Sequence, residues 1–161
     1  MVILSMSEID RLLIISNSKQ EGAMSDIIRK VDYFYIKSAN KPGEGAKVLR
    51  AFRDEGINLL AFSGFPQGQR AQIDFIPEDP AMFEAAAKRI GLKLSKKKIG
   101  FLVQGQDRPG AVAEIMGRLA DAKINVTAID AISAGEGRYG AILWVKPKEV
   151  EKAAQALGAS S

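Results

Sequence analysis

The tripeptide Lys41-Pro42-Gly43 returns 67 residues later as Arg108-Pro109-Gly110. The stretch Gly56-Ile57-Asn58-Leu59 returns at the same offset as Lys123-Ile124-Asn125-Val126. A constant offset across two separate motifs indicates that one module was duplicated. Two copies of about 65 residues are fewer than a solenoid needs, so each copy is expected to form a small domain of its own. The predicted organisation is an N-terminal extension at 1–30, a first domain at 31–95 and a second domain at 98–158.

The composition of the chain limits the chemistry that it can perform. With 47% hydrophobic and 26% charged residues, the 161-residue chain can bury a core. It contains no cysteine and no histidine, which excludes disulfides, Cys/His zinc sites and Ser-His-Asp triads. Catalysis would have to rest on carboxylates, lysine, arginine or hydroxyl groups. We therefore expect a protein that is not an enzyme, with no catalytic residue, no metal and no cofactor.

The charges indicate a soluble chain without a nucleic-acid surface. The net charge is +4, and its one dense cluster, Lys93, Lys96, Lys97 and Lys98, lies between the repeats. We interpret this cluster as a solvated linker, with a patch that binds anions or nucleic acid as the alternative. The apolar run at 12–15 is too short for a signal peptide or a membrane span and follows acidic residues, so we expect a cytoplasmic protein with no membrane partner.

Hydrophobic periodicity predicts the same order of elements in both repeats. Period-two runs rich in β-branched and aromatic residues indicate strands, and apolar residues at helical spacing that end at a glycine indicate helices. In the first repeat we expect strands at 31–36, 57–62, 71–75 and 92–94, and helices at 46–55 and 82–90. In the second we expect strands at 101–103, 126–129 and 141–145, and helices at 113–119 and 150–157. The prediction is an α+β fold of two ferredoxin-like βαββαβ modules in tandem, with antiparallel sheets, helices on one face and no fourth strand in the second module.

Alternation along the strands predicts which residues face the helices. The expected inward residues are Phe34, Ile36, Ile57, Leu59, Ile73 and Phe75, with Phe101, Val103, Ile124, Val126, Ile142 and Trp144 in the second repeat. The opposite face would carry Tyr33, Tyr35, Leu60, Phe62, Leu102, Ile129, Leu143 and Val145. So much apolar surface is too large to leave in water, which predicts a homodimer that packs these faces together. A second route to a dimer is strand addition at the edge that the missing fourth strand leaves unpaired. The alternative to a dimer is that the N-terminal extension covers these faces.

The doubled motifs resemble the signature of the ACT domain. The matching residues are Asp107-Arg108-Pro109-Gly110 after a strand and Ile124-Asn125-Val126 one helix later, and in the first repeat Asn40-Lys41-Pro42-Gly43 and Gly56-Ile57-Asn58-Leu59. The resemblance implies ACT-like modules that pair side by side and bind a small metabolite, usually an amino acid, at their interface. It also implies a regulatory role toward an enzyme of amino-acid metabolism.

The residues of these motifs suit such a ligand on physical grounds. A helix that begins after Pro-Gly presents N–H groups without intrahelical partners, which attract a carboxylate. A glycine lets a ligand approach the backbone, and asparagine can both donate and accept hydrogen bonds. The predicted ligand-binding residues are Asn40, Lys41, Pro42, Gly43, Asn58, Leu59, Asp107, Arg108, Pro109, Gly110, Asn125 and Val126. We expect the second loop to dominate, because Asp107 is charged where the first loop has the neutral Asn40. The same residues can also simply form turns and cap helices.

Two other functions share this predicted topology. RNA-binding modules stack bases on exposed strand aromatics, but the alternation around Trp144 predicts that its ring is buried. An acylphosphatase would use an arginine in the loop and an asparagine, but Arg108 arrives one residue early for that family's motif. We therefore favour a non-catalytic sensor that binds an amino acid or a similar small carboxylate.

Overall fold

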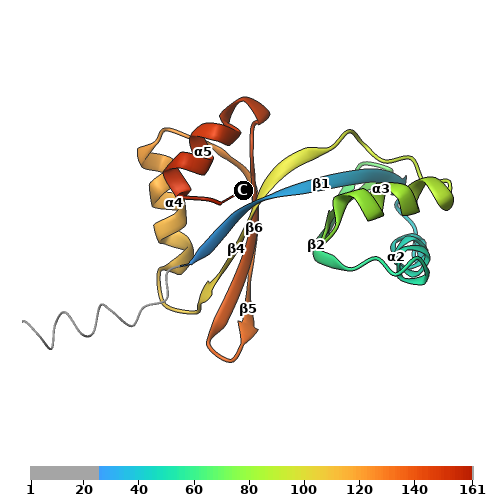
Figure 1. Ribbon diagram of the computed structural model, residues 1–161, viewed down its shortest axis with the longest axis horizontal. Helices are drawn as coiled ribbons and strands as arrows, with labels where there is room; N and C mark the ends of the chain where they lie inside the picture. The colour runs from blue at the N-terminus through green and yellow to red at the C-terminus, as the bar shows by residue number, and fades with distance from the viewer. Residues whose placement is uncertain (1–25, 161) are drawn as a thin grey trace, which may run out of the picture.

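The computed structural model describes residues 26–160, which form a mixed α/β fold around one antiparallel sheet (Figure 1). The elements of the first half are β1 (Ile27–Ala39), α2 (Glu44–Asp54), β2 (Leu59–Gln67), β3 (Arg70–Pro77) and α3 (Pro80–Arg89). Those of the second half are β4 (Lys98–Gln106), α4 (Ala111–Asp121), β5 (Val126–Gly135), β6 (Arg138–Val145), the 3-10 turn η1 (Pro147–Glu149) and α5 (Val150–Leu157).

The sheet has six strands in the order β2-β3-β1-β4-β6-β5, so strands of both repeats belong to one hydrogen-bonded sheet. This differs from the expectation of a separate sheet for each repeat. The strand β1 makes the connection, because its first part pairs with β4 from Ile27 to Tyr33 and its second part pairs with β3 from Phe34 to Ala39. Figure 1 shows this long strand crossing from one half of the molecule to the other.

The shared strand also explains a missing element. The second repeat was expected to lack a fourth strand, and the beginning of β1 lies against β4 at that place in the sheet. The short strand expected at 92–94 is wrong, because residues 92–97 form an extended connection without strand pairing. This connection nevertheless follows β1, since the backbone N–H of Ser95 donates to the Tyr35 carbonyl at 2.9 Å. The chain then enters β4 beside Tyr33.

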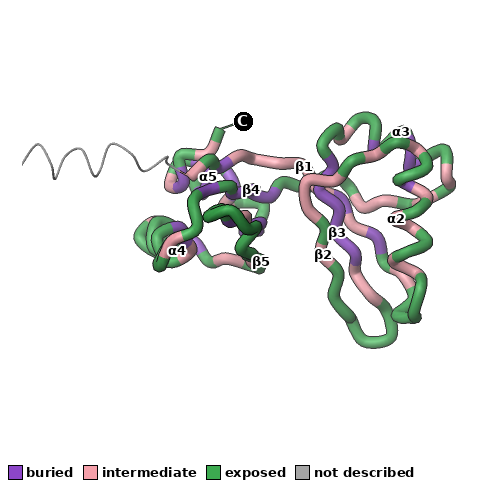
Figure 2. Tube along the Cα trace, turned by 90° about the horizontal axis from the view of Figure 1, so that it is seen from below, coloured by how far each residue is buried: buried purple, intermediate pink, exposed green. Residues whose placement is uncertain are grey.

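Each half has its own helix-covered core. In the first half the rings of Phe34, Phe52, Phe75 and Phe83 pack together under α2 and α3, and Phe52 and Phe83 stack with centroids 4.4 Å apart. In the second half α4 and α5 cover a core that includes Phe101, Ile115, Leu119, Leu143 and Leu157. Figure 2 shows the buried residues along the central strands and the inner sides of the helices.

The expected orientation of β6 is wrong by one residue. Leu143 and Val145 lie in the helix-covered core, whereas Ile142 and Trp144 lie on the opposite face of the sheet. The pairing register gives the reason. Phe34 pairs with Phe75 in the first half and Phe101 pairs with Leu143 in the second, so Leu143 and not Trp144 corresponds to Phe75. The β5–β6 ladder is irregular between Ser133 and Gly135, near the turn into β6. This irregularity changes the sequence offset between corresponding residues of the two repeats by one. A slip of one residue moves every side chain of a strand to the other face of the sheet.

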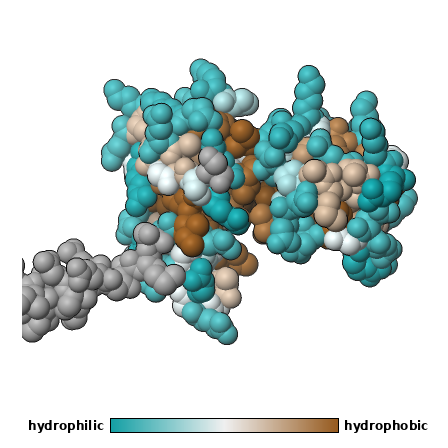
Figure 3. Space-filling model, in the orientation of Figure 1, coloured by the Kyte–Doolittle hydropathy of each residue, from teal (hydrophilic) through white to brown (hydrophobic). Residues whose placement is uncertain are grey.

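A third apolar cluster lies between the two halves. Ile76, Leu102, Ile142 and Trp144 are buried there, and Val31, Tyr33, Leu60 and Ala61 pack against them. Figure 3 shows hydrophobic residues gathered between the two halves. Of the residues expected on the open face, Tyr33, Leu60 and Leu102 are therefore covered by the other half of the same chain. Ile129 was expected there too, but it packs against the second helix-covered core. Phe62 was expected on this face, but its ring packs against Phe75 of the first helix-covered core, because the β2–β3 register shifts between Leu59 and Ala61.

Candidate functional site

The two Pro-Gly loops have the same local geometry. Gly43 and Gly110 precede α2 and α4 with φ angles of 90° and 87°, in the left-handed region that favours glycine. The hydrogen bonds also correspond, because Glu44 N–H donates to the Lys41 carbonyl and Ala111 N–H donates to the Arg108 carbonyl. At neither helix start does a side chain cap the first turn, so the Asn40 and Asp107 side chains are not caps in this part of the chain.

The second loop is tied to its surroundings by side chains. Asp107 accepts a hydrogen bond of 2.7 Å from Ser133 of β5, and its N–H donates to the Gly137 carbonyl. The guanidinium of Arg108 lies between Asp26 and Glu114, which raises the pKa of Arg108 above its ordinary value. The first loop, 40–43, is exposed.

The predicted asparagines do not join the loop of their own repeat. Asn125 immediately precedes Val126, which pairs with Val145 at the end of β6, whereas the second loop follows Gln106, which pairs with Arg138 at the start of β6. At about 3.3 Å per residue along a strand, the two motifs are roughly 20 Å apart. Asn58 likewise lies at the far end of the β2–β3 ladder from the first loop and donates a hydrogen bond of 3.0 Å to Glu78. Leu59 packs at the rim of the first core.

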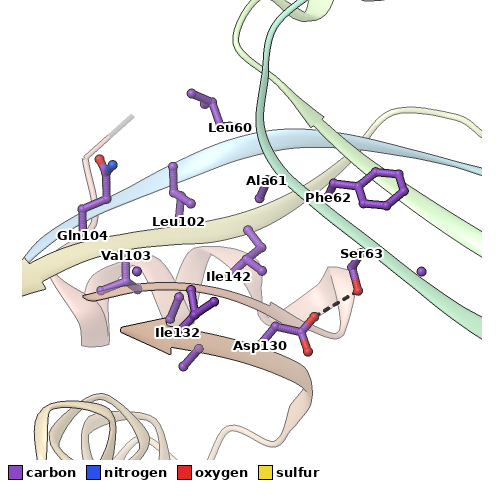
Figure 4. A pocket seen from close by; sticks show the side chains of 14 residues that line it. Leu60, Ala61, Phe62, Ser63, Leu102, Val103, Gln104, Asp130, Ile132 and Ile142 are labelled. Atoms are coloured by element: carbon purple, nitrogen blue, oxygen red, sulfur yellow. Dashed lines mark hydrogen bonds between the residues drawn. The ribbon is translucent and has the colours of Figure 1, made fainter. Parts of the chain in front are cut away.

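A cavity of about 570 Å³ lies between the two halves, and Figure 4 shows the side chains that line it. Most of its lining is apolar, and the polar side chains are Ser63, Gln104 and Asp130. The other lining residues are Leu60, Ala61, Phe62, Gly64, Leu102, Val103, Ala131, Ile132, Gly140, Ala141 and Ile142. A mostly apolar cavity of a few hundred Å³ with a few polar groups is the usual form of a small-molecule site.

The outer strands β2 and β5 form opposite walls of this cavity. They are the first and last strands of the sheet order. Even so, Ser63 Oγ of β2 donates a hydrogen bond of 3.0 Å to Asp130 Oδ2 of β5. An outer strand leaves backbone N–H and C=O groups without ladder partners, and such groups can bind the ends of an amino acid. None of the lining residues is among the predicted site residues. The signal that could have found two of them is the repeat offset itself, because Ser63 and Asp130 are 67 residues apart.

Ionisable side chains lie in the interface beside the cavity. Asp74 is 3% exposed, and burial raises the pKa of its carboxyl group although Gln72 donates a hydrogen bond of 3.0 Å to it. Burial, together with the nearby charge of Asp74, raises the pKa of Tyr33 to about 12. The equivalent of Asp74 in the second repeat is Ile142. Asp74 pairs with Tyr35, and Ile142 pairs with Leu102 at the same register position.

The arrangement also bears on the two alternative functions. Trp144 is 7% exposed and packs edge-on against Tyr33, so its ring offers no open stacking platform. Arg108 and Asn125 lie at opposite ends of β6, so they cannot act on one phosphate. Within 26–160 no group of three or more acidic side chains is placed to hold a metal ion. Over the same residues, every helix is too short or too polar to cross a bilayer.

Residues 101–159, which make up most of the second repeat, match the ACT domain family. No curated protein matches the sequence. Solved structures resemble the fold over most of the chain. Protein BT0572 from Bacteroides thetaiotaomicron has a TM-score of 0.69 and 19% identity, over 83% of this chain and 88% of that one.

Two aspartate kinase structures also resemble the fold. The ligand-free regulatory subunit of aspartate kinase from Thermus thermophilus has a TM-score of 0.57 and 18% identity, over 84% of this chain and 96% of that one. Aspartokinase III from E. coli, in complex with aspartate and ADP, has a TM-score of 0.51 and 14% identity, over 84% of this chain and 32% of that one. The family match identifies an ACT domain at residues 101–159, and the fold of the chain is like that of the regulatory subunit of aspartate kinase.

Proposed function

We propose that the protein is a non-catalytic regulatory module that binds an amino acid or a similar small carboxylate between its two halves. The observation that carries this proposal is the cavity between β2 and β5, where equivalent residues of the two repeats meet at the Ser63–Asp130 hydrogen bond. Its volume and its apolar lining suit a small metabolite. The ACT domain match and the likeness to a regulatory subunit of aspartate kinase support the same class of function.

The predicted loop residues enter this proposal unequally. Asp107 contacts Ser133. The residue before Ser133, Ile132, lines the cavity. The second loop, with Arg108, Pro109 and Gly110, therefore lies beside one end of the cavity, and we propose that it contributes most to binding. Asn40, Lys41, Pro42 and Gly43 would contribute less, and Asn58, Leu59, Asn125 and Val126 would act through the strands that they begin.

A cavity-filling variant tests the proposal directly. Gly140 lines the cavity, and a Cβ atom added there would meet only the Val103 carbonyl at 3.7 Å. The Gly140→Leu protein should therefore fold and lose ligand binding. Gly117→Leu is the matched control, because Gly117 is exposed on α4 and has open space around it.

The measurement is thermal unfolding of the three proteins against the twenty amino acids and related small acids. A ligand at 100 times its Kd should stabilise wild type and the Gly117→Leu protein by about 2.7 kcal/mol and leave the Gly140→Leu protein unchanged. Stabilisation of all three proteins by one compound would place its site elsewhere. A silent screen together with hydrolysis of acylphosphates would overturn the proposed class of function.

We also propose that the chain forms a homodimer and acts on an enzyme of amino-acid metabolism. The apolar side chains left exposed along the outer strands, Phe62, Phe65 and Ile132, support a contact between copies at these edges. Ile132 is 73% exposed, so Ile132→Lys should convert a dimer to a monomer in light scattering without loss of stability. A wild-type monomer at all concentrations would contradict the dimer.

A further inference from the structure

The carboxylate of Asp26 is buried at the second loop although it belongs to neither repeat. Its side chain is 6% exposed. Three donors surround it. Arg108 donates from its two terminal nitrogens at 3.2 and 3.4 Å, and the Tyr139 hydroxyl donates at 2.9 Å. Burying a carboxylate is costly unless it is paired and hydrogen-bonded, so this set of donors forms a built carboxylate site.

The strand beneath the carboxylate is shaped for it. Asp26 lies against Gly105 of β4, where a Cβ atom would collide with its carboxylate and would lie 2.8 Å from the Tyr139 ring. Gly105 does not have a left-handed φ angle, so its backbone conformation does not require glycine. The close approach of the Asp26 carboxylate and of the Tyr139 ring accounts for glycine at this position.

The first repeat has no such pocket. Gly105 pairs with Tyr139 in the β4–β6 ladder, and at the same register Ser38 pairs with Ala71 in the β1–β3 ladder. A serine replaces the glycine, an alanine replaces the tyrosine, and the exposed Lys41 replaces Arg108. The pocket is therefore specific to the second repeat and is not a general consequence of the fold.

We propose that Gly105, Arg108 and Tyr139 form a carboxylate-binding pocket which Asp26 fills as an internal ligand, and that a free small carboxylate can replace it. The pocket lies on the helix-facing side of β4, whereas Gln104 lines the cavity on the other side, so the two sites lie on opposite faces of this strand and share the second loop. The proposal rests on the proposed function only in treating Arg108 as a ligand-binding residue.

Replacement of Asp26 would have a structural consequence. Asp26 directly precedes β1, the strand that pairs with both halves. A carboxylate that takes its place releases the start of this strand. Through its contacts with Arg108 and Tyr139, Asp26 thus holds the start of β1 in place while the second loop is free of ligand. We call this contact the latch.

Formate rescue tests the pocket without knowledge of the natural ligand. Asp26→Ala removes the internal carboxylate, so the variant should unfold at a lower temperature than wild type. Formate at about 100 mM should then raise its unfolding midpoint by roughly 2–4 °C, with sodium chloride at the same ionic strength as the reference. Wild type should show no such rise, because formate that enters its pocket only replaces the contacts that Asp26 already makes.

Three further variants give the experiment its controls. Asp32→Ala removes another carboxylate of β1, which pairs with Lys97 at 3.1 Å and is 27% exposed, and it should not respond to formate. Asp26→Ala combined with Arg108→Gln should lose the response, because the main donor is gone. Asp26→Ser is the second variant if Asp26→Ala does not fold.

Hydrogen exchange tests the latch. Amides of residues 27–33 should exchange faster in the Asp26→Ala protein than in wild type, and formate should slow them again. An equal response of all variants to formate, or none in a folded Asp26→Ala or Asp26→Ser protein, would overturn the pocket. Failure of both variants to fold in formate would overturn it too. A positive result would stand even if the amino-acid screen of the wild-type protein were silent.

Discussion

Ser63 and Asp130 occupy the same position in the two repeats and are joined by a hydrogen bond of 3.0 Å. Each pairs with the neighbouring strand at an equivalent register, Ser63 with Asp74 and Asp130 with Ile142. The two strands that carry them are the opposite edges of the sheet order, so the sheet curves until its edges meet. The cavity and the third apolar cluster both lie within this curve.

The first prediction concerns the packing between the halves. Ile76 is fully buried in the cluster that joins them, so Ile76→Ala should lower the free energy of unfolding by about 2–5 kcal/mol. Denaturant unfolding measures this loss. Ile27→Ala is the control, because Ile27 is 51% exposed and should cost far less. A loss below about 1 kcal/mol at Ile76 would mean that the halves do not pack as described.

The second prediction concerns the close approach at Gly105. Gly105→Ala should destabilise the protein by about 1–3 kcal/mol, because the new methyl group must displace Asp26 and the Tyr139 ring. Gly64→Ala is the matched strand control, since its nearest neighbour would be the Gln72 carbonyl at 3.9 Å. Thermal or denaturant unfolding compares the two. Equal effects of both substitutions would contradict the contact with Asp26.

The third prediction is a pH dependence that originates from Tyr139. Burial and the hydrogen bond to Asp26 raise the pKa of Tyr139 from 10.0 to about 12. Because its pKa is raised in the folded state, its contribution to stability is complete below pH 10 and is lost as the pH rises toward 12. Tyr139→Phe should cost about 1–3 kcal/mol at pH 8, and this difference from wild type should shrink between pH 10 and 12. A difference that stays constant across this range would contradict the raised pKa.

The fourth prediction concerns Asp74 in the interface. Burial raises the pKa of its carboxyl group, so its stabilising effect is complete below its ordinary pKa of 3.8 and is lost as the pH rises through the raised value. At pH 7 the ionised group is therefore unfavourable where it lies. Asp74→Asn keeps an oxygen that can accept from Gln72 and should be more stable than wild type at pH 7, with the gain disappearing near pH 3. The exposed Asp121→Asn is the control, and a loss of stability at pH 7 for Asp74→Asn would contradict the argument.

Local patterns were sufficient to predict most of the elements. Gly43 and Gly110 precede the first helix of each repeat, as the Pro-Gly motifs predict, and Phe34, Phe75 and Phe101 lie in the helix-covered cores as the alternation predicts. These features depend on neighbours in the chain. Period-two patterning decides which face of a strand is buried, and a glycine with a positive φ angle decides where a helix begins.

The candidate site was harder to predict from the sequence than the helices and strands. The predicted residues lie in loops and strand ends that the structure places at different ends of the sheet, whereas the cavity is lined by strand residues that no local motif distinguishes. Asp26 lies outside both repeats and contacts Arg108 across 82 residues of sequence. A contact over such a separation depends on the path of β1, which no local pattern specifies.

The sequence by itself determined the order of helices and strands within 31–158, apart from the strand expected at 92–94, and the helix-facing side of β1, β3 and β4. It could do so because a constant offset, a period of two and a turn residue are all properties of nearby residues. Only the tertiary structure decided that β1 is shared between the halves, that the ladder irregularity near Ser133 turns Trp144 to the other face, and that the two open faces cover each other. These outcomes depend on strand pairing and on the burial of apolar surface between distant segments, and that free energy is available only once the whole sheet has formed.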